Sequence, residues 1–262
     1  MRDNFLSGWA LILGASSGFG EAAALTLAES GMDIFGVHLD RKGTLPNVER
    51  ITTKIKQMGR QAVFFNVNAA DPERRAEVIK SIEQREAKVF VLHHSLAFGT
   101  LRAFISTSGE EVIAQAQMEM TLDVMANSLV YWAQDLVSHR LMDRGGRIFA
   151  MTSAGGARVW RTYGAVSAAK SALESHIRQL ALELGPLGIT ANAVCAGVTD
   201  TPALRKIPGF EKMIEMAKAK NPGGRLTTPQ DVADALVLLA HPKAHWITGN
   251  VIQVDGGELI VD

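Results

Sequence analysis

The sequence is poor in cysteine, has no excess of either charge and contains no long apolar run. Its 262 residues include one cysteine, Cys195, which excludes a disulfide within the chain and is typical of a reducing compartment. Lys+Arg and Asp+Glu number 27 each, so bulk charge gives no basis for binding nucleic acid or a membrane surface. No stretch reaches the roughly 20 apolar residues of a membrane span. These absences favour a cytoplasmic globular protein without nucleic-acid or membrane partners.

Metal-ligand spacing is also absent. No cluster of His, Cys, Asp and Glu has the separation of a metal site, so we expect no bound metal. His93 and His94 are interpreted as packing or turn residues, and Cys195 as an inert buried thiol.

Short β-rich runs alternate with helical patterns along the whole chain. We expect strands at 9–13, 33–38, 62–67, 88–93, 146–152, 189–194 and 250–254. Helices are expected at 21–30, 48–58, 72–84, 110–143, 163–184 and 229–240. This order predicts one α/β domain over residues 1–262, a doubly wound parallel sheet of about seven strands with helices on both faces. The Gly/Pro-rich stretch at about 197–222 is expected to form a substrate-binding loop or lid.

A glycine-rich turn follows the first expected strand. Gly14, Gly18 and Gly20 have the spacing G-x-x-x-G-x-G and lead into a helix. Small residues at this point let the backbone approach a pyrophosphate, and the helix N-terminus offers unpaired N–H groups. We therefore predict a Rossmann-like dinucleotide site, to which the same turn contributes Ser16, Ser17 and Phe19.

Tyr163 and Lys170 are the strongest candidates for chemistry. Residues seven apart on a helix share a face but are separated by about 10.5 Å of rise, against about 6 Å for the four-residue spacing. The residue four before Lys170 is Val166, which cannot transfer a proton. A phenol displaced by one turn suits the reduction of a conjugated thioester, in which charge develops on an oxygen three bonds from the carbon that takes the hydride.

The glycine turn and the Tyr/Lys pair also resemble a known family. The run G-A-S-S-G-F-G closely matches the phosphate loop of the short-chain dehydrogenase/reductase superfamily. Asn127 and Ser153 stand where that superfamily places a helix Asn and an active-site Ser, and the run from Gln253 to Gly257 resembles its C-terminal strand. The resemblance covers essentially the whole chain and implies catalytic roles for Tyr163, Lys170, Ser153 and Asn127. Ser153 could equally be a turn residue, and Asn127 a helix-kink or packing residue.

Within that superfamily, Y-x6-K resembles the bacterial enoyl-acyl-carrier-protein reductases. The stretch from Val91 to Phe98 resembles their V-H-S-x-x-F and lacks the N-N-A-G of ketone reductases, while Cys195-Ala-Gly197 resembles their S-A-G. Many members carry a second Tyr where this chain has Ser153, and a divergent NADPH-using subgroup has Ser there. The resemblance implies reduction of an acyl thioester on acyl-carrier protein in fatty-acid elongation, by a homotetramer.

The cofactor contacts are predicted from the same comparison. They comprise Lys170 on the ribose and residues at the strand ends: Asn66, Val67, Ser95, Gly197, Val198 and Thr201. His38 occupies roughly the place where NAD-specific sites carry an acid. Arg41 and Lys42 could pair a 2′-phosphate, which favours NADPH, whereas Asp40 could accept ribose hydroxyls, which would favour NADH. Lys170 is also expected to lower the pKa of Tyr163.

Three other functions stay open. The nearest is a ketone or alcohol oxidoreductase of the same superfamily, of the 3-oxoacyl or hydroxysteroid type. The others are a non-catalytic dinucleotide-binding regulator and a structural assembly protein. Assembly itself is expected from two apolar helix stripes that one sheet face should not cover completely. The stripes are Leu122, Met125, Leu129, Trp132, Leu136 and His139, and Leu173, Ile177, Leu180 and Leu184.

Overall fold

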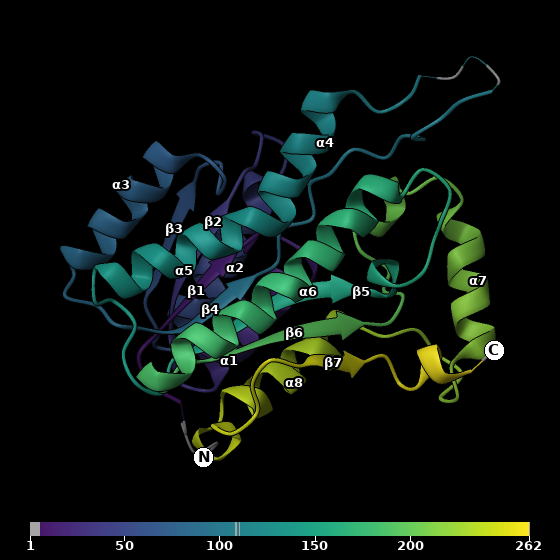
Figure 1. Cartoon of the computed structure of the whole chain (residues 1–262). Helices are drawn as coiled ribbons and strands as arrows, with labels where there is room; N and C mark the ends of the chain where they lie inside the picture. Colours follow the sequence, from purple (N-terminus) through teal and green to yellow (C-terminus); the bar gives the residue numbers. More distant parts are fainter. Residues whose placement is uncertain (1–5, 108, 110, 262) are drawn as a thin grey trace.

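The computed structural model describes residues 6–107, 109 and 111–261 and contains one seven-stranded parallel sheet (Figure 1). The strand order is β3-β2-β1-β4-β5-β6-β7, and the strands are β1 Trp9–Leu13, β2 Asp33–His38, β3 Ala62–Asn66, β4 Val89–His94, β5 Arg147–Ser153, β6 Thr190–Ala196 and β7 Val251–Val254. Every expected strand is found within two residues at each end. The doubly wound fold predicted from the alternation is therefore confirmed.

Helices cover both faces of the sheet (Figure 1). The α-helices are α1 Gly18–Glu29, α2 Leu45–Gln57, α3 Pro72–Glu83, α4 Gln115–Leu122, α5 Ser128–Ser138, α6 Gly164–Leu184, α7 Phe210–Lys220 and α8 Pro229–Ala240. Two apolar cores separate the layers, one between the sheet and α1, α2 and α8, the other between the sheet and α3, α5 and α6. Among the described residues, no helix combines the length and apolar character that crossing a membrane requires.

The strands form because both of their faces are buried in apolar side chains. All five residues of β1 are buried, and Trp9 stacks on Phe35 of β2 with ring centroids 4.0 Å apart. The expected start of the last helix is confirmed at Thr228, whose hydroxyl accepts from Asp231 N while the Asp231 carboxylate accepts from Thr228 N.

The long helix expected at 110–143 is wrong in its extent. The residues from Gln115 to Ser138 form α4, a π-helical turn at Asp123–Asn127, and α5; residue 110 lies outside the described part of the chain. The turn carries its own side-chain bonds, because Ser128 Oγ donates to Val124 O at 2.9 Å and lies 2.9 Å from His94 Nε2. The stretch at 197–222, expected as a loop, contains α7, which stands beyond the arrowheads of β5 and β6 (Figure 1).

The two stripes do not leave the apolar patches that we expected. Apart from Leu122, which is half-buried, and His139, which is exposed, their residues are buried in the chain's own core. Exposed apolar side chains occur elsewhere, and some of them lie in the segment from α8 to the edge strand β7, where Leu238 is 72 % exposed and Trp246 89 % exposed. Ile247 and Val251 lie in the same region of the chain.

Candidate active site

The glycine turn lies at the carboxyl end of β1, next to β4, where the strand order reverses direction. Gly14 has φ +89°, and a Cβ there would lie 2.5 Å from Ser95 O. A Cβ at Gly20 would lie 2.0 Å from Gly14 O. The turn is therefore closed by backbone packing that only glycine allows at these two positions. In open α/β sheets, this reversal point is where ligands bind.

The N-terminus of α1 is open toward this turn. Ser17 occupies the N-cap position, is exposed and makes no capping hydrogen bond with its side chain, so it satisfies none of the first N–H groups of the 12-residue helix. Gly18 lies against the Thr201 methyl group, which is 3.5 Å from the position of a Gly18 Cβ. Ser95 is tied to the turn by its N–H, which donates to Leu13 O at 2.8 Å. Ser95 and Thr201 thus lie beside the glycine turn, and their contacts with the cofactor stay predictions. The turn and the open helix N-terminus fit a bound pyrophosphate.

The end of β2 carries a clamped carboxylate. Asp40 Oδ2 lies 2.9 Å from His38 Nδ1. Burial raises the Asp40 pKa, but the neighbouring Thr44, Ser16 and His38 side chains together outweigh burial and hold the pKa below its ordinary value. Burial outweighs the Asp40 interaction at His38, whose pKa is lowered. The side-chain amide of Asn66 makes two hydrogen bonds with the Asp40 backbone. Its Oδ1 accepts from Asp40 N at 2.9 Å, and its Nδ2 donates to Asp40 O at 3.0 Å. The carboxylate is therefore ionised at neutral pH and already contacts the His38 ring.

The two cations beside it are available for a ligand. Arg41 and Lys42 are exposed, and their side chains make no hydrogen bond or ion pair with any residue that the structure describes. Val67, also predicted to contact the cofactor, lies next to this corner because its N–H donates to His38 O at 2.8 Å.

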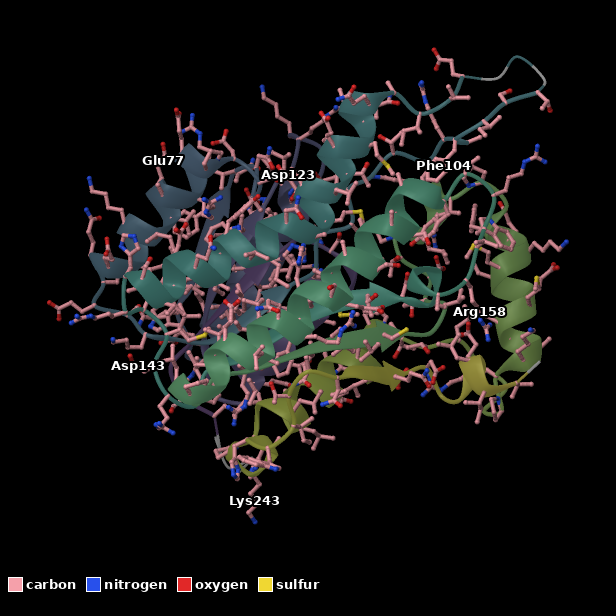
Figure 2. The ribbon with its side chains drawn as sticks, in the orientation of Figure 1. Glu77, Phe104, Asp123, Asp143, Arg158 and Lys243 are labelled. Atoms are coloured by element: carbon pink, nitrogen blue, oxygen red, sulfur yellow. The ribbon has the colours of Figure 1, made fainter. Side chains whose placement is uncertain are left out.

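Tyr163 is the residue at the start of α6 and faces the end of β5. A Cβ at Gly155 would lie 2.5 Å from the Tyr163 ring and 3.2 Å from Ser153 Oγ, so both side chains pack on this glycine. The Ser153 hydroxyl lies close enough to Tyr163 to lower its pKa. Yet Ser153 Oγ is buried without a well-formed hydrogen bond to any described residue. A buried hydroxyl with unused capacity beside a phenol suits a polar ligand group. Phe104, from the loop after β4, covers Gly164 next to Tyr163 at the same end of the molecule (Figure 2).

Lys170 is buried about two helical turns after Tyr163 on α6. It is 5 % exposed, and its Nζ donates to Met151 O of β5 at 2.7 Å. Burial lowers its pKa to about 8, while Glu174 and Cys195 act in the opposite direction. Val166, at the alternative donor position, is 5 % exposed within the core. The structure thus leaves Tyr163 as the proton-bearing group of this helix face.

The expectation that Lys170 lowers the pKa of Tyr163 is wrong. Burial raises the pKa of Tyr163, only the contact with Ser153 opposes this, and Lys170 has no part in it. The cause is the seven-residue spacing, which separates the two Cα positions by about 10.5 Å of helix rise. Lys170 reaches the β5 backbone instead of the phenol.

Asn127 ends the π-helical turn, and its side chain contacts His176 of α6 instead of Lys170. Its Oδ1 accepts from His176 Nε2 at 3.1 Å, which ties the turn to the outer part of α6. The backbone N–H of Val198 donates to the buried carboxylate of Glu258 at 2.9 Å. Gly197, its neighbour, lies where a Cβ would be 2.4 Å from Thr227 Oγ1. Catalytic and cofactor roles for Asn127, Gly197 and Val198 stay predictions.

Three further titratable side chains near the site, those of His93, His94 and Cys195, are buried and neutral. His93 and His94 lie in the sheet, where burial lowers the pKa of each to about 3. Burial raises the pKa of the Cys195 thiol to about 12, so it is not a nucleophile at neutral pH. No group of three potential metal ligands occurs among the described residues.

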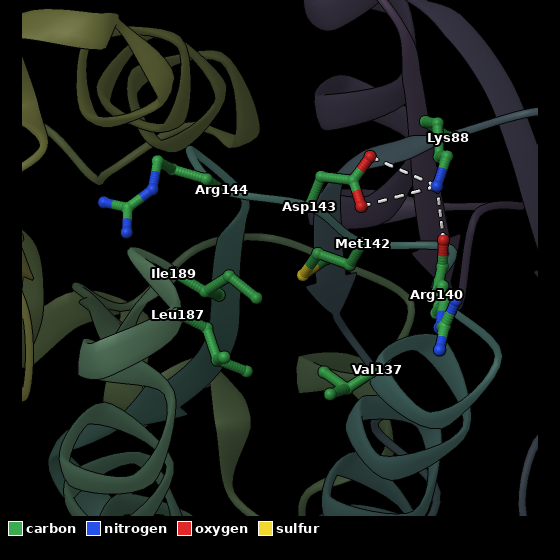
Figure 3. Close-up of a pocket in the computed structure, with 8 residues that line it drawn as sticks. All are labelled: Lys88, Val137, Arg140, Met142, Asp143, Arg144, Leu187 and Ile189. Carbon is green, nitrogen blue, oxygen red and sulfur yellow. Dashed lines mark hydrogen bonds and ion pairs between the residues drawn. The ribbon is translucent and has the colours of Figure 1, made fainter.

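A surface depression of about 340 Å³ lies at the opposite end of the strands from this site (Figure 3). Its lining includes Lys88 and Ile189, which directly precede β4 and β6, so it lies at the amino ends of the strands. Lys88 is paired there with Asp143 at 3.1 Å. Because the sheet is parallel, this depression is separate from the Tyr163 site, which lies at the carboxyl ends.

Sequence reasoning missed Glu174, Thr152 and Gly155. Thr152 Oγ1 donates to Glu174 Oε1 at 2.6 Å, directly beside Ser153 and Lys170. The i, i+4 spacing of Lys170 and Glu174 was visible in the sequence and places both on one helix face. The pairing with β5 was not, because it depends on how α6 lies on the sheet.

Comparison with known proteins agrees with this geometry. A family model described as "Enoyl-(Acyl carrier protein) reductase" matches residues 14–258. The chain belongs to this family, within the short-chain dehydrogenase/reductase superfamily. It is therefore an oxidoreductase of a superfamily that binds NAD(P)(H).

Named relatives differ in the reaction that their names give. The chain is 29 % identical to "1-cyclohexenylcarbonyl-CoA reductase" of Streptomyces collinus, covering 96 % of this chain and 86 % of the relative. It is 27 % identical to "3-oxoacyl-[acyl-carrier-protein] reductase FabG" of Buchnera aphidicola, covering 95 % and 96 %. The structure of "Enoyl-[acyl-carrier-protein] reductase (NADH)" from Aquifex aeolicus VF5 superposes with TM-score 0.85 at 26 % identity, covering 98 % of both chains.

Proposed function

We propose that the protein reduces the C2=C3 double bond of a trans-2-enoyl thioester, with NADPH as its cofactor. The observation that carries this proposal is the displaced phenol. Tyr163 stands at the start of α6 beside the unused Ser153 hydroxyl, and the position one turn closer to Lys170 is the buried Val166. A ketone reductase needs its proton donor beside the carbon that takes the hydride, whereas an enoyl thioester develops charge on a more distant oxygen.

Tyr163 is the group that would stabilise this oxygen. Its raised pKa keeps the phenol protonated at neutral pH, so it is a hydrogen-bond donor to a developing enolate oxygen. Ser153 Oγ can donate a second bond to the same atom or orient the phenol. Both groups sit in a largely water-excluded place, where such bonds are stronger than in water.

The glycine turn, the open N-terminus of α1 and Lys170 are the groups that would hold the cofactor. Gly14, Gly18 and Gly20 with the first N–H groups of α1 suit the pyrophosphate, and Lys170 suits ribose hydroxyls. When bound, a nicotinamide cofactor supplies the hydride. The Lys170 ammonium has three N–H donors, so it can bind ribose hydroxyls with two of them while the third stays bonded to Met151 O.

The choice of NADPH rests on the corner at the end of β2. The Asp40 carboxylate is held by His38 and has a lowered pKa, whereas Arg41 and Lys42 have no partner among the described residues. A 2′-phosphate needs cations of this kind, and charge-assisted bonds to it are strong. If a ligand displaced His38 from Asp40, the carboxylate would accept ribose hydroxyls and favour NADH.

We further propose that the acyl group is carried by acyl-carrier protein, that the enzyme works in the cytoplasm and that it is a homotetramer. The apolar surface that supports assembly is the one near β7, formed by Leu238, Trp246, Ile247 and Val251. Exposed apolar side chains gathered at one edge of a sheet are typical of an interface between subunits.

The substrate class can be tested by following cofactor oxidation with crotonyl thioesters and acetoacetyl thioesters. We expect kcat/KM to be much higher for the crotonyl compound, and higher on acyl-carrier protein than on coenzyme A. A preference for the acetoacetyl compound would identify a ketone reductase instead. A preference for coenzyme A would overturn the carrier alone.

Tyr163→Phe tests the oxyanion donor. Losing one preorganised donor should lower kcat by roughly 10²–10³-fold and leave cofactor affinity unchanged. The chain has two tyrosines, so Tyr131→Phe, on the exposed side of α5, is a matched control that should keep full activity. Turnover near that of the wild type in Tyr163→Phe would mean that Ser153 or a water molecule stabilises the charge.

Arg41→Ala tests the cofactor choice. Losing one charge-assisted bond to a 2′-phosphate should weaken NADPH binding by roughly 10–100-fold and leave NADH binding little changed. Lys54→Ala, an exposed cation on α2, is the control and should change neither. Equal losses for both cofactors, or a wild type that prefers NADH, would make Asp40 the selector.

Light scattering tests the assembly. We expect a particle of about four times the 28.2 kDa of one chain at micromolar concentration. Trp246→Ser should shift it toward smaller species by removing the most exposed aromatic ring of the β7 edge. A fully active particle with the mass of one chain would show that assembly is not needed.

A further inference from the structure

Lys170 is a buried cation whose surroundings offer little compensation. Its ammonium is hydrogen-bonded to one backbone carbonyl, Met151 O, and lies under α6 against β5 and β6. Moving an ammonium group out of water costs several kcal/mol unless an opposite charge is near. A cation needed for cofactor binding must therefore have a counter-charge.

The titratable side chains near Lys170 come from the elements packed around it. On β4, His94 is neutral at physiological pH because burial lowers its pKa to about 3. On β6, Cys195 is neutral because its pKa is raised to about 12, and on α6 itself the phenol of Tyr163 is protonated. This leaves Glu174, one turn further along α6, as the carboxylate that raises the Lys170 pKa against burial.

Glu174 is also fixed in place. Its Oε1 accepts from Thr152 Oγ1 at 2.6 Å, and a Cβ at Gly156 would lie 2.9 Å from the same oxygen. Thr152 lies between Met151 and Ser153 in β5. The Met151 carbonyl accepts a hydrogen bond from Lys170, and Ser153 lies beside Tyr163. One carboxylate thus joins α6 to the three residues of β5 that shape the site.

We propose that Glu174 is a positioning residue: its carboxylate supplies the negative charge that Lys170 faces and, through Thr152, holds the end of β5 against α6. The proposal rests on the proposed function only in giving Lys170 a role in cofactor binding. The double bond of the substrate plays no part in it.

The experiment measures the cofactor dissociation constant by nicotinamide fluorescence between pH 6.5 and 9.5, for NADPH and NADH. Charged Lys170 favours binding, so wild-type affinity should fall as pH rises through the Lys170 pKa. Glu174→Gln keeps an acceptor for Thr152 but removes the charge. Because an opposite charge nearby shifts a pKa by about one unit or more, the midpoint should move to lower pH by about one unit. At pH 6.5 the two proteins should bind the cofactor within a few-fold of each other.

Two further variants separate charge from anchoring. Glu183→Gln makes the same change at an exposed position of α6 and should leave the midpoint unchanged. Thr152→Val keeps the charge but removes the anchoring bond, so kcat should fall while the midpoint moves less than in Glu174→Gln.

An unshifted midpoint in Glu174→Gln overturns the role of the charge. If that variant does not fold, Thr152→Val decides, and wild-type kcat in it overturns the anchoring role. A shifted midpoint in an enzyme that does not reduce enoyl thioesters would support this inference and contradict the proposed function.

Discussion

One packing contact, the burial of helix α6 against β5 and β6, is the constraint on which the site depends. Leu173 and Ile177 are fully buried in the core on one side of the sheet, and they fix the rotation of the helix about its axis. Once that rotation is set, the same face must carry Tyr163, Lys170 and Glu174 toward the carboxyl ends of the strands. The core and the candidate site therefore share one helix face, and a change in the packing would move Tyr163.

The cost of this arrangement is the burial of polar groups. The Lys170 ammonium and the Ser153 hydroxyl lie where water has little access. In such a place charges interact more strongly than in water, and each uncompensated group is expensive. The neutral state of His94 and Cys195 and the single carboxylate of Glu174 are consistent with a site in which one positive charge is kept and others are avoided.

The cofactor end of the site is organised differently. At the glycine turn the backbone itself makes the shape, since Gly14 and Gly20 lie in contacts that no Cβ could enter. At the end of β2, side chains make the shape: Asp40 is hydrogen-bonded to His38 and Asn66, and Arg41 is exposed beside it. The shape of the glycine turn is therefore set by backbone packing, whereas the corner at the end of β2 is set by a few side chains.

The sequence by itself determined the fold and the main candidates of the site. The apolar runs of β1 and β6 and the glycine turn at Gly14 are local patterns. Such patterns can be recognised in the sequence without knowing how the helices pack on the sheet. The break of the expected 110–143 helix at Asp123–Asn127, helix α7 and the direction of Asn127 toward His176 were decided only by the tertiary structure. So was the failure of Lys170 to act on Tyr163 and the contact of Glu174 with Thr152. These features depend on which residues of distant elements meet, and helix periodicity gives the face of a residue but not the partner on the sheet beneath it.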